Sequence, residues 1–346
     1  MSKLFEVKPF DKAFYEEKLK SFLPSKFVDI HTHIWHERFR VENAKAPVRG
    51  QSWPGRVAKQ NPIEDLVETY KLMFPDKNVI PLLFGQPSFD YDIDALNDYV
   101  EACAKEYKYP ALALAVPDWS QEKFENVILK GGFLGCKVYL NFAAPYIPQD
   151  EIRIFDFLPP HQLEVLDKHG WVVVLHIPRK ARLKDPVNLA QMLEIEKKYP
   201  NVKLIIAHVG RAYCPEDVGN AFEVLAETKN MMFDFCANTN QWVFEQLIKA
   251  VGSKRILFGS DMPILRMRSR RICENGTYVN LIPKGLYGDV SGDIHMREVE
   301  GEEAEKITFF MYEEIDAFRR AAEATGLTAA DIEDIFYNNA AKLLNL

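Results

Sequence analysis

Apolar runs alternate with helical-looking segments along most of the chain. The runs are largely continuous, which is typical of strands buried on both faces of a parallel sheet. Strands are predicted at 27–33, 78–84, 111–116, 133–140, 171–176, 202–208, 231–235 and 255–261. Helices are predicted at 62–74, 92–107, 120–130, 159–169, 186–199, 216–228, 240–251, 302–325 and 329–344.

Eight strands alternating with helices predict an α/β fold of the (β/α)₈ TIM-barrel type. The amphipathic N-terminal segment and the last two predicted helices would add extra N- and C-terminal helices outside the barrel. An open, doubly wound sheet is the alternative, but no Gly-x-Gly-x-x-Gly follows the first strand. No internal repeat or linker divides the sequence, so we expect one domain over 1–346 with long loop insertions at 36–60 and 262–300.

Metal-binding residue types stand where four of the predicted strands end. His31 and His33 close the first strand, and because alternate strand positions face the same side, their two imidazoles can reach one ion. His176, His208 and Asp261 end three of the later strands. Active sites of α/β barrels lie at the C-terminal ends of the strands. The pattern therefore predicts a metal site on this face of the barrel.

The residue types at these strand ends indicate which chemistry the site supports. Imidazole and carboxylate suit Zn²⁺, and also Mn²⁺, Fe²⁺ or Co²⁺, so we expect one divalent transition metal, with zinc first. Three histidines and one aspartate would leave a position for water, whose pKa zinc lowers to about 7. We expect two catalytic residues: Asp261, which can accept the proton of the water, and His208, which can polarise a carbonyl or transfer a proton.

Composition and charge narrow the class of protein. The apolar fraction of 47% can fill a large core, and the net charge of −7 argues against a nucleic-acid partner. No segment has the length of a membrane span or the apolar region of a signal peptide, so we expect no membrane partner. The five cysteines, at 103, 136, 214, 236 and 273, show no paired spacing. We therefore expect free thiols and a cytoplasmic protein that acts on a small molecule.

The ordered set of motifs resembles the amidohydrolase superfamily, and within it the amidohydrolase-2 branch that includes aminocarboxymuconate-semialdehyde decarboxylase. The matching positions are 28–33, 176, 208–210, 258–263 and 338–344. The resemblance implies a distorted (β/α)₈ barrel, and members of the branch are often dimers, which makes a homodimer an expectation. It also implies a metal held by His31, His33, His176 and Asp261, with His208 handling protons.

Lys137 lies in the fourth predicted strand and has two interpretations. In binuclear members of the superfamily, a lysine on this strand is carboxylated and bridges two metals. In the branch that this chain resembles, the lysine need not be a ligand, and it can contact substrate or close the barrel mouth. We expect Lys137 to be a substrate-binding residue.

Several arginines follow the strand ends and are candidates to bind a substrate carboxylate. A guanidinium pairs with a carboxylate through two parallel hydrogen bonds. The alternative for each arginine is a solvated loop or a pair with a nearby acid. We expect Arg211, Arg266 and Arg268 to contact the substrate, and the further candidates are Arg179, Arg270 and Arg271.

Three functions are compatible with these residues. The first, which we favour, is a metal-dependent hydrolase of a small amide, ester or lactone that carries a carboxylate. The second is a metal-dependent, non-oxidative decarboxylase of a small unsaturated or aromatic acid. The third is a non-catalytic barrel that binds a ligand, but such a protein would be expected to lose part of the ligand set.

Overall fold

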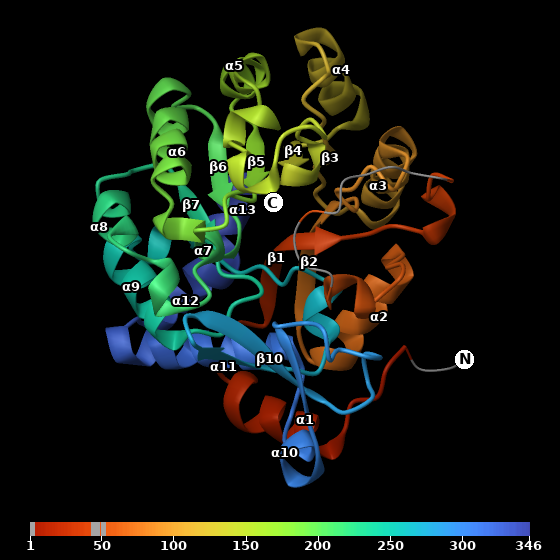
Figure 1. Ribbon diagram of the computed structural model, residues 1–346, viewed down its shortest axis with the longest axis vertical. Helices are drawn as coiled ribbons and strands as arrows, with labels where there is room; N and C mark the ends of the chain where they lie inside the picture. The colour runs from red at the N-terminus through yellow and green to blue at the C-terminus, as the bar shows by residue number, and fades with distance from the viewer. Residues whose placement is uncertain (1–3, 43–48, 50–52) are drawn as a thin grey trace.

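A ring of short parallel strands surrounded by helices forms the centre of the protein (Figure 1). The computed structural model describes residues 4–42, 49 and 53–346, so parts of the 36–60 insertion lie outside the described residues. The barrel strands are β1 (Lys26–His33), β2 (Asn78–Phe84), β3 (Ala113–Leu114), β4 (Gly135–Val138), β5 (Val172–Leu175), β6 (Lys203–Ile206), β7 (Met232–Asp234) and β8 (Ile256–Leu257).

The predicted α/β barrel is confirmed, and backbone hydrogen bonds close the ring. Strands β1 and β2 pair in parallel, and β3 to β8 form a second parallel set. Leu112 donates its N–H to Leu83, which joins β3 to β2. Ile30 donates to Phe258 and Asp261 donates to His31, which joins β8 to β1. The residues of the first and last strand ends are therefore neighbours.

Helices cover the outside of the ring, most of them where the sequence predicts them. They are α1 (Pro9–Phe14), α2 (Ile63–Met73), α3 (Ile93–Tyr107), α4 (Gln121–Gly131), α5 (Pro160–His169), α6 (Pro186–Lys198), α8 (Ala221–Ala226), α9 (Gln241–Val251), α10 (Gly301–Glu305), α11 (Phe310–Thr325), α12 (Ala329–Glu333) and α13 (Asn339–Leu344). Helix α13 packs Leu343 and Leu344 against the inner barrel residues Val28 and Leu257. None of the described helices has the length and apolar character needed to span a membrane.

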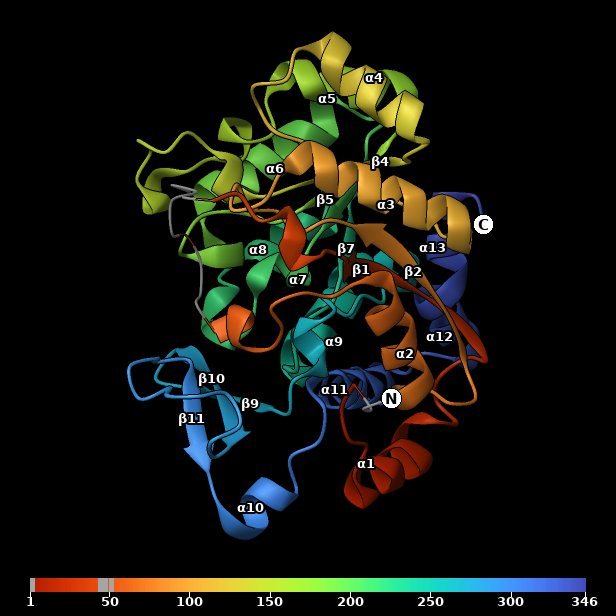
Figure 2. The ribbon, with the colours of Figure 1, turned by 90° about the vertical axis from the view of Figure 1, so that its right-hand side faces the viewer.

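The 262–300 insertion folds into a small antiparallel and parallel sheet, where the sequence predicts a loop. Strands β9 (Arg270–Glu274), β10 (Thr277–Pro283) and β11 (Met296–Val299) make this ribbon, which projects from the barrel together with α10 (Figure 2). Asn275 and Gly276 both have positive φ, at 52° and 74°, and turn β9 into β10. Asn-Gly favours this kind of tight hairpin, so the signal was present in the sequence.

A disulfide joins Cys214, which follows β6, to Cys273 in the ribbon. Their Cα atoms lie 5.8 Å apart although the residues are 59 positions apart in the sequence. The expectation of five free thiols is therefore wrong for this pair, because only the fold of the ribbon brings the two cysteines together. Cys103, Cys136 and Cys236 are free and buried.

Candidate metal centre and substrate cavity

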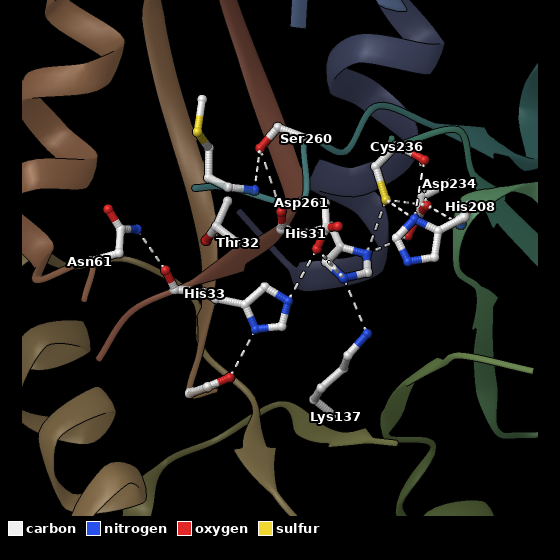
Figure 3. A network of polar contacts seen from close by, with 12 residues as sticks. His31, Thr32, His33, Asn61, Lys137, His208, Asp234, Cys236, Ser260 and Asp261 are labelled. Atoms are coloured by element: carbon white, nitrogen blue, oxygen red, sulfur yellow. Dashed lines mark hydrogen bonds and ion pairs between the residues drawn. The ribbon is translucent and has the colours of Figure 1, made fainter. Parts of the chain in front are cut away.

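His31, His33 and Asp261 form a compact buried group at the C-terminal end of the barrel (Figure 3). Asp261 Oδ1 lies 3.2 Å from His33 Nε2 and 3.5 Å from His31 Nε2. The His33 ring donates from Nδ1 to the carbonyl of Gly85 at 3.0 Å, which leaves the lone pair of the neutral ring on Nε2. Two acceptors therefore face each other, and only a proton or a cation between them makes this arrangement favourable.

Asp234, at the end of β7, orients the His31 ring from behind. Its Oδ2 accepts a hydrogen bond from His31 Nδ1 at 2.9 Å, so the lone pair of His31 points from Nε2 toward the centre. Its Oδ1 accepts from the backbone N–H of His208 at 2.7 Å and from the thiol of Cys236 at 2.9 Å. One fully buried carboxylate thus holds two of the candidate site histidines.

His208 begins a left-handed turn that directly follows β6. His208, Val209, Gly210 and Arg211 all have φ between 50° and 61°, which costs energy for residues other than glycine. The bond to Asp234 holds the start of this turn, and His208 Nδ1 donates to the carbonyl of Cys236 at 3.1 Å. The Nε2 atom of the ring makes no hydrogen bond to the described residues, and both His208 and Arg211 line the cavity.

His176 lines the same cavity, but it is not part of the compact group. Its ring centre lies 5.2 Å from that of His208 and 4.7 Å from that of Tyr139. Its buried Nδ1 atom has no hydrogen-bond partner among the described residues. An unpaired buried nitrogen is costly, so His176 has a donor atom available for a ligand.

Lys137 is fully buried beside the compact group, and its Nζ donates to His31 Nε2 at 3.1 Å. Burial lowers the pKa of Lys137, while the charges of Asp234 and Asp261 act in the opposite direction. The lysine therefore lies close enough to a candidate ligand atom to contact either a metal or a substrate.

The protonation states of the site suit metal binding at neutral pH. Burial and the charge of Lys137 lower the pKa of His31 to about 3. Burial also lowers the pKa of His176 and of His208. Burial alone would raise the pKa of Asp261, but the contact with His33 and the neighbouring histidines keeps it below its ordinary value. Neutral imidazoles beside an ionised carboxylate are the forms that ligate metal ions.

A cavity of about 250 Å³ opens above this group and contains several cationic side chains. Arg211 donates only to the backbone carbonyls of Ile177, Pro178 and Arg179. Arg271, on β9, donates to Asn280 and to the carbonyl of Ala237. Within the described part of the chain, neither guanidinium has a carboxylate partner. The cavity therefore contains two guanidinium groups that are not paired with a carboxylate of the described residues.

Arg266 and Arg268 do not line this cavity, which corrects the expectation that they contact substrate. The guanidinium of Arg268 is buried against Asp11 near the N-terminus, at 2.9 and 2.5 Å. Arg266 is half-buried outside the cavity and interacts with Asp65. Arg270 pairs with Glu313 on α11. Of the four arginines, Arg271 alone is among the described cavity residues. Arg270 and Arg271 differ because neighbouring side chains on β9 point to opposite faces, whereas Arg266 and Arg268 precede this strand.

Sequence reasoning missed several residues of the site. Asp234 had a signal, since it is the next-to-last residue of the seventh predicted strand, close to the position that His176 and His208 take in theirs. Tyr213 and Tyr278, which line the cavity together with Arg182, had no comparable signal. Their rings pack at 5.0 Å between segments that are distant in the sequence, so only the folded ribbon identifies them.

Replacing Asp234 with asparagine is expected to weaken metal binding by about 10- to 100-fold, as for other partners that orient a ligand histidine. The single amide oxygen cannot accept from both His31 Nδ1 and the backbone N–H of His208. The His31 proton would then move to Nε2, the atom that faces the centre. Competition with a chelator measures the affinity, and Asp167→Asn, outside the cavity, is the control. An unchanged affinity for the metal would show that Asp234 does not determine which ring nitrogen of His31 carries the proton.

Comparisons with known proteins agree with this geometry. The amidohydrolase-2 family model, described as amidohydrolase, matches residues 28–270. A search of curated proteins finds no match. A dihydroxybenzoic acid decarboxylase from a Polaromonas species, solved with manganese and 2-nitroresorcinol, is 16% identical with a TM-score of 0.54, covering 93% of this chain and 98% of that one.

Two further solved structures share the fold at similar distance. A Pseudomonas putida protein, provisionally assigned as a 2-pyrone-4,6-dicarboxylic acid hydrolase, is 16% identical with a TM-score of 0.55, covering 93% of this chain and 98% of that one. A 2,6-dihydroxybenzoate decarboxylase from Rhizobium is 15% identical with a TM-score of 0.53, covering 93% and 99%. At these identities the likeness establishes the shared fold alone.

Proposed function

The chain belongs to the amidohydrolase family, whose members are metal-dependent hydrolases or decarboxylases, and from this membership we propose that it hydrolyses a small amide, ester or lactone bearing a carboxylate. The observation that carries the proposal is the meeting of a metal-type donor group, His31, His33 and Asp261, with unneutralised guanidinium groups in one cavity. The donor group supplies a place for water activation, and the guanidinium groups supply a place for the carboxylate.

The donor atoms fit one divalent transition metal. The facing acceptors on His33 and Asp261 need a proton or a cation between them, and a metal ion at this place would also be reached by the His31 lone pair. His176 is proposed as a fourth ligand on the strength of its unpaired nitrogen. A zinc ion held there would supply Lewis acidity and lower the pKa of a water toward about 7. Zinc is proposed over manganese because three of these four ligands are imidazoles.

The proton transfers of hydrolysis fall to Asp261 and His208. The pKa of Asp261 is lowered, so its carboxylate is available to accept a proton from the attacking water. The free Nε2 of His208 faces the same cavity, and its neutral ring can polarise the substrate carbonyl or pass a proton to the leaving group. Asp234 keeps the His208 turn in place during both steps.

Arg271 is the proposed anchor for the substrate carboxylate. Burial lowers the pKa of its guanidinium, and the rings of Tyr278 and Tyr213 lie 4.2 and 4.9 Å from it. A buried cation without an acidic partner is costly, and an incoming carboxylate would remove that cost. Arg211, at the end of the left-handed turn, is the second candidate.

Changing Arg271 to methionine is expected to lower kcat/KM for a carboxylate substrate by about 10- to 100-fold, since a hydrogen bond to a charged group contributes about 1.5–3 kcal/mol. Methionine keeps the apolar stem between the aromatic rings. Arg270→Met is the matched control, because Arg270 lies next to Arg271 on β9 but pairs with Glu313. Equal kinetics for both variants and the wild type would remove the support for an anionic substrate.

The proposed reaction is tested by metal analysis followed by a substrate panel. We expect about one metal ion per chain and hydrolysis of carboxylate-bearing amides, esters or lactones, measured by product release. The same panel, scored for CO₂ release, tests the alternative of decarboxylation. Hydrolysis that persists after exhaustive chelation would contradict the metal-dependent mechanism. A metal-loaded protein that turns over neither class would favour the binding function.

A further inference from the structure

Three aromatic and cationic residues form one side of the cavity, and two different chain segments supply them. Tyr213 follows the left-handed turn after β6, whereas Arg271 and Tyr278 lie on β9 and β10 of the ribbon. The two tyrosine rings pack at 5.0 Å, and the Arg271 guanidinium lies against both. We call these three residues the cation–aromatic wall. Its shape depends on how firmly the ribbon is held against the barrel.

The Cys214–Cys273 disulfide ties those two segments together beside the wall. Cys214 directly follows Tyr213 in the sequence, and Cys273 lies two residues after Arg271 on the same strand.

The wall also contacts the barrel side without covalent bonds. Arg271 donates to the carbonyl of Ala237, Trp53 Nε1 donates to the Tyr278 hydroxyl, and the Arg182 guanidinium lies 5.2 and 5.3 Å from the rings of Tyr213 and Tyr278. Tyr278 and Ile282 of the ribbon are also buried in the main hydrophobic core. The disulfide is therefore a covalent cross-link that adds to these contacts and to the backbone connections of the ribbon.

We propose that Cys214–Cys273 is a reversible thiol–disulfide modification site that sets how tightly the cavity holds its substrate. With the bond formed, Arg271 and the two tyrosines are held at the spacing described above. With the bond reduced, the ribbon retains its own packing of Val279, Leu281 and Ile307 but is attached to the barrel by non-covalent contacts. The metal-type group lies on β1 and just after β8, and we expect its geometry to be unchanged when the bond is reduced.

The exposure of the two sulfur-bearing residues favours attack from one side. Cys273 is exposed, whereas Cys214 is buried. The thiolate of a dithiol reductant would attack Cys273 Sγ, the S–S bond would break, and Cys214 would leave as a thiolate and take up a proton. The second thiol of the reductant would then displace Cys273, so that two protein thiols form and the dithiol becomes a disulfide. The other three cysteines are buried, which confines the chemistry to this pair.

The test compares the oxidised and the reduced metal-loaded enzyme. A water-soluble phosphine is the laboratory reductant, since it takes up the oxygen of one water as the disulfide gains two hydrogens, and it does not chelate zinc as dithiols do. Thiol titration follows reduction, and metal content is measured alongside. We expect KM to rise by roughly tenfold while kcat stays within about twofold, because the wall is displaced and the metal group is not. Reoxidation should restore the original KM.

Hydrogen exchange gives a readout that needs no substrate. Reduction is expected to speed amide exchange over residues 270–282 and to leave β5 and β6 unchanged. The KM measurement rests on the proposed function, whereas the exchange measurement does not. If no substrate is found, the exchange measurement still tests the thiol–disulfide proposal. The Cys214→Ser/Cys273→Ser variant should have the KM and the ribbon exchange rates of the reduced enzyme, and the phosphine should change neither.

Three results would overturn the proposal. The first is release of both thiols without any change in KM or in ribbon exchange. The second is a bond that the phosphine reduces only when the protein unfolds. The third is a parallel loss of kcat and metal on reduction, which would make the disulfide a support of the whole fold. Should the double variant fail to fold, the wild-type reduction and reoxidation cycle still decides between these outcomes.

Discussion

Replacing His33 with alanine is expected to remove most of the bound metal and to abolish turnover. His33 Nε2 lies 3.2 Å from Asp261 Oδ1, and its Nδ1 is already committed to the Gly85 carbonyl. Loss of a direct ligand should weaken metal binding by more than the roughly 100-fold that an orienting partner contributes. Metal content after gel filtration, measured by elemental analysis, checks this result.

Two further alanine substitutions are needed to interpret the metal content of the His33→Ala variant. His176→Ala tests the proposed fourth ligand, and metal loss equal to that of His33→Ala would place His176 in the direct ligand set. His169→Ala is the control, because His169 lies at the end of α5 and pairs with Glu125 outside the cavity. Full metal content in the His33 variant would contradict the site itself.

Replacing His208 is expected to lower kcat by on the order of 10²–10⁴ while the metal content stays near that of the wild type. The ring lies beside the compact group, 5.0 Å from the His31 ring, and its free Nε2 faces the cavity. A group that moves protons without ligating the metal should affect turnover and not metal retention. Steady-state kinetics and elemental analysis of the same preparation measure both.

The choice of substitution at this position matters because His208 has a φ of 58°. Alanine is strained in this conformation, whereas asparagine tolerates it. His208→Asn therefore accompanies His208→Ala, and agreement between the two variants would assign the lost activity to the imidazole rather than to a displaced turn. Metal loss as large as that of the His33 variant would make His208 a ligand instead.

The metal-type residues could be predicted from the sequence because of where parallel strands end. His31, His33 and Asp261 each close a continuous apolar run, and a barrel brings such ends together on one face. The arginines could not be assigned in this way. Arg268 and Arg271 are three residues apart, yet one is buried against Asp11 and the other lines the cavity. That difference depends on the path of the ribbon, which the alternation of residues along 270–283 only partly indicates.

Two other features depend on tertiary contacts that leave little trace in local sequence. The left-handed turn at His208 contains a single glycine, and a bond from a distant carboxylate, Asp234, holds it. The disulfide joins cysteines whose separation in the sequence resembles no familiar spacing. Both features are determined by elements that meet only after the barrel and the ribbon have formed.

The hydrogen bonds between β1 and β8 also impose an order on the folding of a newly made chain. Translation releases His31 and His33 long before Asp261, so a nascent chain carries two of the three donor residues with no partner strand for that edge of β1. While a strand edge is unpaired, its backbone groups can pair with another unfinished chain and cause aggregation. The proposed ligands come from both ends of the ring, so an ion bound there would stabilise the closed ring over any partly made one. Supply of the metal during synthesis should therefore influence the yield of folded protein as well as its activity.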